Sequence, residues 1–149
     1  MAERGFYHLT RTPLETALPK LLGRVLAQKA RAVVRIGTPE RLEPLSTALW
    51  LSPDPDWLPH GHEGTGHATL QPIWLTTRAE NPNGATHLFL VDGAEAEGTD
   101  GFARVFDLFD GSDEAAVAAA RRRWAAAKAA GDTLTYWQQT DRGWEKKAG

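Results

Sequence analysis

Three histidines and a glutamate gather in one glycine-rich segment, and they are the first residues whose spacing could support chemistry. His60, His62, Glu63 and His67 offer nitrogen and oxygen ligands to a metal ion. Their spacing matches neither a helical nor a zinc-knuckle pattern, and the glycines around them would not hold ligands firmly. We therefore expect a solvated loop at this point and no metal site.

The glycines at 61, 64 and 66 also raise the possibility of a phosphate-binding loop. A dinucleotide fingerprint lies between the first strand and the first helix, where glycines admit the pyrophosphate to a helix N-terminus. In this chain residues 10–13, Thr-Arg-Thr-Pro, occupy that position, and no Gly-Lys-Ser/Thr motif occurs. We expect no nucleotide cofactor. The alternative is a small nucleotide-dependent enzyme on a Rossmann-like sheet.

Nucleophilic catalysis has no clear basis in the sequence. Ser46 and Ser112 lack a nucleophile-elbow motif and a neighbouring base, while His8 and His87 fall on expected strands. The chain has no cysteine, which excludes disulfides, thiolate metal sites and cysteine nucleophiles, and fits a reducing compartment. We predict no catalytic residues and a cytoplasmic protein.

One helical face joins apolar side chains to cations. Val117, Arg121, Trp124 and Lys128 stand at i, i+4, i+7 and i+11, so they share a face. Between residues 113 and 131 four cations face two carboxylates, although the whole chain has a formal charge of −2. The residues alone slightly favour a solvated basic face with the tryptophan packed on a sheet. The alternative is a pocket for a peptide with acidic residues and an aromatic carboxy-terminus.

The chain contains six tryptophans, a residue type enriched at binding hot spots. Trp74 and Trp137 lie on expected strands and are predicted to be core residues. Trp50 and Trp57 lie at the end of a helix and inside a proline-rich loop, where they can either pack the loop down or stay exposed as binding anchors.

The elements that would position these residues alternate between strands and helices. Strands are expected at 5–9, 32–36, 72–76, 86–91, 102–109 and 133–137, and helices after residue 12, through 42–49 and from 113 to 130. Thr12 and Glu15 suggest a capping box around Pro13, and Ser112 is the expected N-cap of the last helix. A long proline- and glycine-rich loop is expected from 52 to 71.

Alternation of this kind predicts an α/β fold in three layers, with a mostly parallel sheet flanked by helices and no nucleotide site. We expect one domain over residues 1–140 and a polar tail over 141–149. The N-terminal residues lack the apolar core of a signal peptide, and no window approaches the ~20 apolar residues of a membrane span. The negative net charge disfavours a broad nucleic-acid-binding surface.

Several blocks of sequence, in order and at their spacing, resemble one known family. They are 6–9 (FYHL), 48–50 (ALW), 57–60 (WLPH), 72–73 (PI), 104–107 (RVFD), 120–124 (ARRRW), Gly131 and 134–137 (LTYW). No block is specific alone, but the resemblance runs from Phe6 to Trp137. The chain is identified on these blocks as a member of the chi subunit family of bacterial DNA polymerase III.

This resemblance implies a non-catalytic accessory subunit that links the clamp loader to single-stranded DNA-binding protein. The tail of that protein would bind the last helix at Arg121, Trp124 and Lys128. Val117 stands where better-known members carry a basic residue, which leaves the site one cation fewer. A second surface, for the psi subunit of the clamp loader or for a repair helicase, maps onto Trp50 and Trp57 and favours exposed anchors there.

Direct binding of single-stranded DNA through tryptophan and arginine is the remaining alternative. The net charge and the gathering of cations on one helix count against it.

Overall fold

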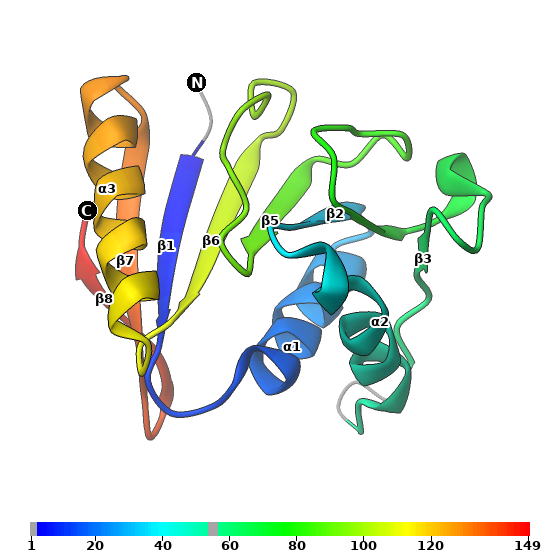
Figure 1. The fold of residues 1–149 in the computed structure, drawn as a ribbon, viewed down its shortest axis with the longest axis horizontal. Helices are drawn as coiled ribbons and strands as arrows, with labels where there is room; N and C mark the ends of the chain where they lie inside the picture. The colour runs from blue at the N-terminus through cyan, green and yellow to red at the C-terminus, as the bar shows by residue number, and fades with distance from the viewer. Residues whose placement is uncertain (1–2, 54–56) are drawn as a thin grey trace.

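The structure, a computed structural model, describes residues 3–53 and 57–149. At its centre is one sheet with the strand order β3-β4-β2-β5-β6-β1-β7-β8 (Figure 1). The strands are β1 Glu3–Leu9, β2 Ala32–Ile36, β3 Gly61–His62, β4 Ile73–Thr76, β5 His87–Val91, β6 Arg104–Asp110, β7 Thr133–Thr140 and β8 Gly143–Ala148. Neighbouring strands in it pair in parallel, except that β8 runs antiparallel to β7. The predicted mostly parallel sheet is confirmed.

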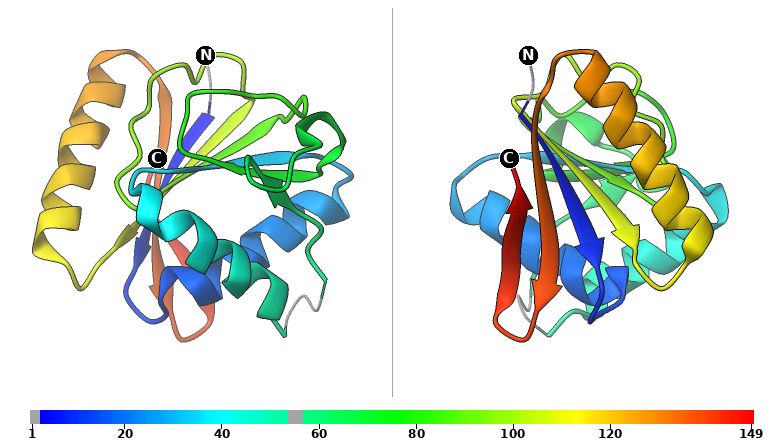
Figure 2. Two further views of the ribbon diagram at one scale, coloured as in Figure 1. Left: turned by 45° about the vertical axis from the view of Figure 1, so that its right-hand side comes forward. Right: turned by 90° about the vertical axis from the view of Figure 1, so that its left-hand side faces the viewer.

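Helices lie on both faces of this sheet, so the three-layer prediction is confirmed. The helices α1 (Leu14–Ala27) and α2 (Leu42–Leu51) pack on one face, and α3 (Glu114–Ala129) packs on the other, against β6 and β7. Figure 2 shows α1 and α3 on opposite sides of β1, β7 and β8. The outer α3 therefore covers only the β6–β1–β7 part of its face.

The apolar core follows from the alternation of side chains along the strands. One cluster joins α1 and α2 to the sheet through fully buried residues such as Leu18, Leu22 and Phe89. On the opposite face a loop between β5 and β6 packs over Trp74 and Leu88. Trp74 is buried, as predicted, whereas Trp137 is only half-buried.

Two predicted helix caps are wrong. The capping box at Thr12 and Glu15 does not form, because Pro13 immediately precedes α1 and the Glu15 carboxylate pairs with Arg41 instead. At α3 the cap is Asp113, not Ser112: its carboxylate accepts hydrogen bonds from the N–H groups of residues 115 and 116. An aspartate at this position also matches the positive end of the helix dipole.

The expected polar tail, 141–149, is also wrong, since β8 extends the sheet. A turn at residues 141–142 returns the chain antiparallel to β7, and Trp144 packs edge-on against Tyr7 at 5.1 Å between ring centroids. The long loop 52–71 contains structure too, namely the short β3 and a 3₁₀ turn at Ala68–Leu70. Residues 54–56 of this loop lie outside the described residues.

Candidate partner-binding sites

A small apolar pocket lies where α3 crosses β6, β1 and β7. Its volume is about 150 Å³. Val117, Ala120, Arg121 and Trp124 line it from α3, and the sheet contributes the rings of Phe6, Phe109 and Tyr136. We call this the α3 pocket. Among the described residues that line it there is no carboxylate, and Arg121 is the single charged group.

Aromatic contacts shape the α3 pocket and fix the orientation of Trp124. The indole ring meets Phe6 edge-to-face at 5.2 Å and Tyr136 edge-to-face at 6.0 Å, both favourable geometries for aromatic pairs. Phe6 and Phe109 are almost fully buried, whereas Trp124 and Val117 keep part of their surface exposed. The pocket therefore has a rigid aromatic floor and an open apolar mouth.

Arg121 is exposed at the rim and supplies the electrostatic field of the pocket. Burial lowers the pKa of His8 on the adjoining strand, and the positive charge of Arg121 lowers it further. Burial raises the pKa of Tyr136, and the same arginine acts against that rise. The Tyr136 hydroxyl and His8 Nδ1 are hydrogen-bonded at 2.6 Å. With the imidazole neutral near pH 7, Arg121 is the cation among the described residues of the site that faces an incoming anion, and it forms no ion pair with any of them.

The other cations of α3 lie outside the α3 pocket. Lys128 is exposed and does not line the pocket, and its position seven residues beyond Arg121 puts it about 10 Å further along the helix. Arg122 is exposed. Arg123 points back to the sheet, where it donates two hydrogen bonds of 2.7 and 2.9 Å to the buried carboxylate of Asp107. The structure thus brings together three of the four predicted tail-binding residues and leaves Lys128 at a distance.

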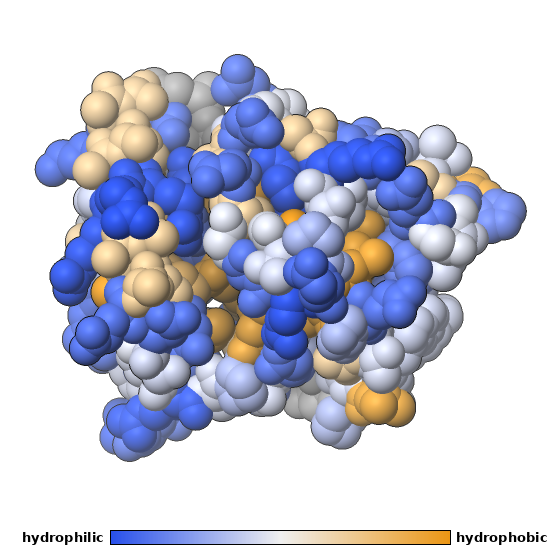
Figure 3. Space-filling view, in the orientation of Figure 1, coloured by the Kyte–Doolittle hydropathy of each residue, from blue (hydrophilic) through white to orange (hydrophobic). Residues whose placement is uncertain are grey.

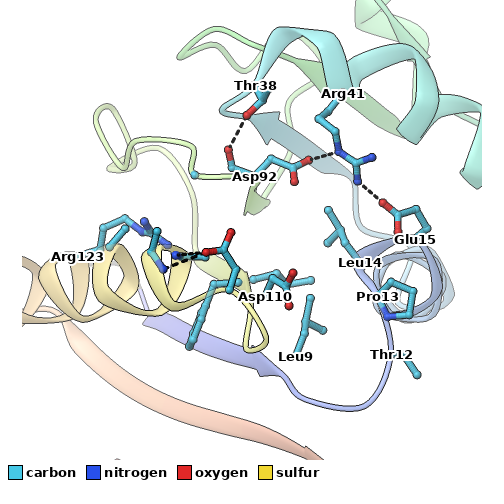
Figure 4. Close-up of a pocket in the computed structure, with 17 residues that line it drawn as sticks. Leu9, Thr12, Pro13, Leu14, Glu15, Thr38, Arg41, Asp92, Asp110 and Arg123 are labelled. Atoms are coloured by element: carbon cyan, nitrogen blue, oxygen red, sulfur yellow. Dashed lines mark hydrogen bonds and ion pairs between the residues drawn. The ribbon is translucent and has the colours of Figure 1, made fainter.

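A wide cleft of about 470 Å³ lies at the carboxyl ends of the parallel strands between α3 and α1 (Figure 4). Rossmann-like folds bind nucleotides at this edge of the sheet. Here its two arginines are already paired with carboxylates: Arg41 with Glu15 and Asp92, and Arg123 with Asp107. Further lining carboxylates, including Asp110, leave an excess of negative charge. Such a lining repels phosphate groups.

The turn between β1 and α1 is filled by the protein itself. The backbone N–H groups of Thr10, Arg11 and Thr12 converge on one acceptor, Gln139 Oε1, at 2.9–3.1 Å. The Gln139 amide in turn donates to Thr12 Oγ1 at 2.6 Å. Converging N–H groups of this kind otherwise form anion sites. Nothing in the local sequence shows this interaction, because Gln139 lies more than 120 residues away.

Ser46 does have a neighbouring base, which corrects the sequence interpretation. Its Oγ lies 3.0 Å from His60 Nε2, and His60 Nδ1 lies 2.7 Å from the carbonyl oxygen of Leu58. Both side chains are buried, at 7% and 5% exposure, and the ring of Trp50 lies 4.1 Å from that of His60. Because the hydroxyl is closed off from substrate, we assign this pair the structural role of fixing the loop 58–61 to α2.

The remaining residues of the histidine segment do not converge. Glu63 pairs with Arg78 at 2.9 Å, and His62 Nδ1 accepts a hydrogen bond from the N–H of Gly64. Within residues 3–53 and 57–149 no group of three or more His, Cys, Asp or Glu side chains is arranged to hold a metal ion.

Apolar side chains stand exposed near the end of α2. The exposed fractions are 53% for Trp50, 75% for Leu51 and 71% for Trp57. Apolar surface is visible at the carboxyl end of α2 in the space-filling view (Figure 3). Large exposed apolar side chains that occur together mark interaction surfaces. Both tryptophans thus have the exposure that an anchor needs.

These features define a class: an α/β protein with a Rossmann-like sheet, in which the β1–α1 turn is filled by the Gln139 side chain and exposed apolar surfaces suit protein partners. The family model for "DNA polymerase III chi subunit, HolC" matches residues 1–135. The chain therefore belongs to the DNA polymerase III chi subunit family, whose members are accessory subunits in DNA replication.

One curated relative supports the same assignment. The "Probable DNA polymerase III subunit chi" of Rickettsia prowazekii (strain Madrid E) is 24% identical over 91 residues, which is 61% of this chain and 55% of that protein. The matched region thus spans about half the length of the relative. In the described part of the chain, no helix has the length and apolarity required to span a bilayer.

Proposed function

We propose that this protein is the non-catalytic subunit that ties the clamp loader of DNA polymerase III to single-stranded DNA-binding protein. The observation that carries the proposal is the α3 pocket, because it combines an aromatic floor with Arg121, the one cation among its described lining residues, which has no ion pair within residues 3–53 and 57–149. The acidic, aromatic-ended tail that the family resemblance implies as ligand matches both features. The aromatic end fits the apolar pocket, and a carboxylate fits the arginine.

Within this proposal each residue of the site has a distinct role. Arg121 forms a charge-assisted hydrogen bond to a carboxylate of the tail, while Trp124 and Val117 provide the apolar contact. Lys128, about two turns further along α3 and exposed, attracts the acidic residues that precede the aromatic end. Its contribution is therefore smaller and more easily screened by salt than that of Arg121.

The second surface, at Trp50 and Trp57, is proposed to hold the clamp loader through its psi subunit, or a repair helicase in its place. Exposed tryptophans of this kind act as anchors when a partner pocket desolvates them. Trp50 is pre-ordered for this role by its contact with the buried His60 ring. The two surfaces would allow one subunit to hold two partners at once.

Titration of a labelled tail peptide against the purified protein tests the proposal. Removal of Arg121 in Arg121→Ala should weaken binding by about 10- to 150-fold, the equivalent of the 1.5–3 kcal/mol of a charged hydrogen bond. Arg122→Ala is the matched control, because this neighbouring arginine is also exposed but does not line the pocket. Equal affinity of wild type and a folded Arg121→Ala would refute the assignment of the site.

A further inference from the structure

A second groove, separate from the α3 pocket, runs along α1 beside the β7–β8 hairpin. Two adjoining cavities of about 400 and 220 Å³ form it, and they share Leu21, Arg24 and Trp144. Its lining follows α1 from Thr16 to Gln28, about 18 Å of helix. We call it the α1 groove. Because α1 lies on the side of the sheet opposite α3 (Figure 2), the groove that it lines lies on that side too.

Aromatic side chains form the wall of the α1 groove on the sheet. Trp137 of β7 stacks on Tyr7 with an interplanar angle of 5° and 5.9 Å between centroids, and Trp144 of β8 meets the same tyrosine edge-on. Both indoles are only half-buried, so each keeps surface available to a ligand. The two tryptophans come from neighbouring strands and line a single continuous groove.

Cations line the groove with little opposing charge. Lys20, Arg24 and Arg104 face it, and within the described residues none of the three forms an ion pair. Asp141 is the one carboxylate among the described lining residues, and it is neutralised by Arg11 at 2.7 Å. Glu3 lies beside Arg104 in the β1–β6 register and reduces the positive field at that end. On balance the groove is positive in a chain of net charge −2.

We propose that the α1 groove binds a short stretch of single-stranded nucleic acid. Unpaired cations would contact its phosphates while Trp137 and Trp144 stack on its bases, which is how sequence-independent single-strand binders work. An acidic peptide without aromatic residues would use the charges but leave the indoles without stacking partners, and duplex bases are not free to stack. The negative net charge excludes a broad nucleic-acid surface, but it permits a weak and local one.

Fluorescence anisotropy with labelled 12-nucleotide probes, oligo(dT) and oligo(rU), tests this proposal on the full chain. If Lys20, Arg24 and Arg104 each contact one phosphate, the logarithm of the association constant should fall with log[salt] with a slope of about −2, since each contact on a single strand contributes about 0.7. Arg24→Glu should weaken binding at least tenfold and make the slope less steep. Trp144→Ala should weaken it at least fivefold, and Trp144→Phe should restore part of the affinity. The tighter of the two probes shows which of the two strands, the deoxythymidine or the ribouridine polymer, is preferred.

Arg122→Glu is the matched control, because it reverses an exposed cation on the opposite face of the molecule. Its affinity should stay within about twofold of wild type. Equal losses in Arg24→Glu and Arg122→Glu would show a purely global charge effect and overturn the proposal. So would the absence of saturable binding at low salt, or displacement of the probe by oligo-glutamate as effectively as by unlabelled oligo(dT). The α3 pocket can fail its own test without affecting this one.

Discussion

Replacement of Asp107 by asparagine should strongly destabilise the protein, because this buried carboxylate holds the buried Arg4 and the half-buried Arg123. Its side chain is 1% exposed, accepts two hydrogen bonds from Arg123 and lies 3.4 Å from the buried Arg4. Burial lowers the pKa of Arg123, but the hydrogen bonds and charge of Asp107, together with the charge of Glu95, raise it overall. In Asp107→Asn both guanidinium groups would stay charged and lose their counterion.

The size of the effect follows from the burial of the group. Loss of one partner from a buried ion pair typically costs about 3–5 kcal/mol. For a chain of 149 residues each kcal/mol lowers Tm by about 2–4 °C, so Asp107→Asn should lower Tm by roughly 6–20 °C. Because Arg123 fixes α3 to β6, the variant should also weaken binding at the α3 pocket, although Asp107 does not line it.

Urea and thermal unfolding, followed by circular dichroism, would measure this change. The triple variant Arg4→Met/Asp107→Leu/Arg123→Met removes all the charges together and should recover most of the lost stability, because no buried charge is left unpaired. Arg122→Met, at an exposed position on the same helix, should change stability by less than about 0.5 kcal/mol. A loss below about 1 kcal/mol in Asp107→Asn would refute the reasoning.

Three further predictions concern the partner surface, the β1–α1 turn and pH. Trp50→Ala or Trp57→Ala should weaken the binding of the clamp loader or helicase by about 2 kcal/mol or more, measured by calorimetry, and leave the affinity for the tail peptide unchanged. A parallel loss of stability would show instead that these tryptophans have a structural role. Gln139→Ala should lower the free energy of unfolding by about 1–3 kcal/mol because three N–H groups lose their acceptor, whereas Gln139→Glu keeps the acceptor and should lose less. Burial lowers the pKa values of His8, His60 and His87 below the usual 6.5. Just below that pH the unfolded chain therefore binds more protons than the folded protein, and the free energy of unfolding should fall from pH 7 towards pH 5. Urea unfolding that shows no such fall would contradict this prediction.

The sequence predicted the elements whose signals are local. The apolar period of α1, the β-branched run of β2 and the Gly131 end of α3 all follow from neighbouring residues, and Gly131 does adopt a positive φ of 84° after the helix. By contrast, β8 carries Glu145, Lys146 and Lys147 and has no apolar alternation of its own. It becomes a strand because it pairs with β7, an interaction that its sequence does not encode locally.

The candidate site also combines residues that local sequence predicts with residues that it does not. The helical spacing of Val117, Arg121 and Trp124 was sufficient to place them on one face, and the structure puts all three around one pocket. The aromatic floor from Phe6 and Tyr136 could not be derived, because it requires knowing that β1 and β7 are neighbours in the sheet. Alternation along each strand predicts on which face of the sheet an aromatic ring lies, but it does not predict which helix or loop covers that ring.

Three consecutive arginines illustrate why this distinction matters for function. Successive residues of an α-helix are about 100° apart, so Arg121, Arg122 and Arg123 must point in three directions. The sheet below decides what each does: the first borders the α3 pocket, the second meets solvent, and the third is neutralised by Asp107. The basic character of the segment is thus weaker than its composition indicates. Within the described part of the chain, Arg121 is the one cation of this run that borders the pocket and forms no ion pair. This favours a ligand recognised by one well-placed charge together with an apolar anchor over one bound by a broad positive field.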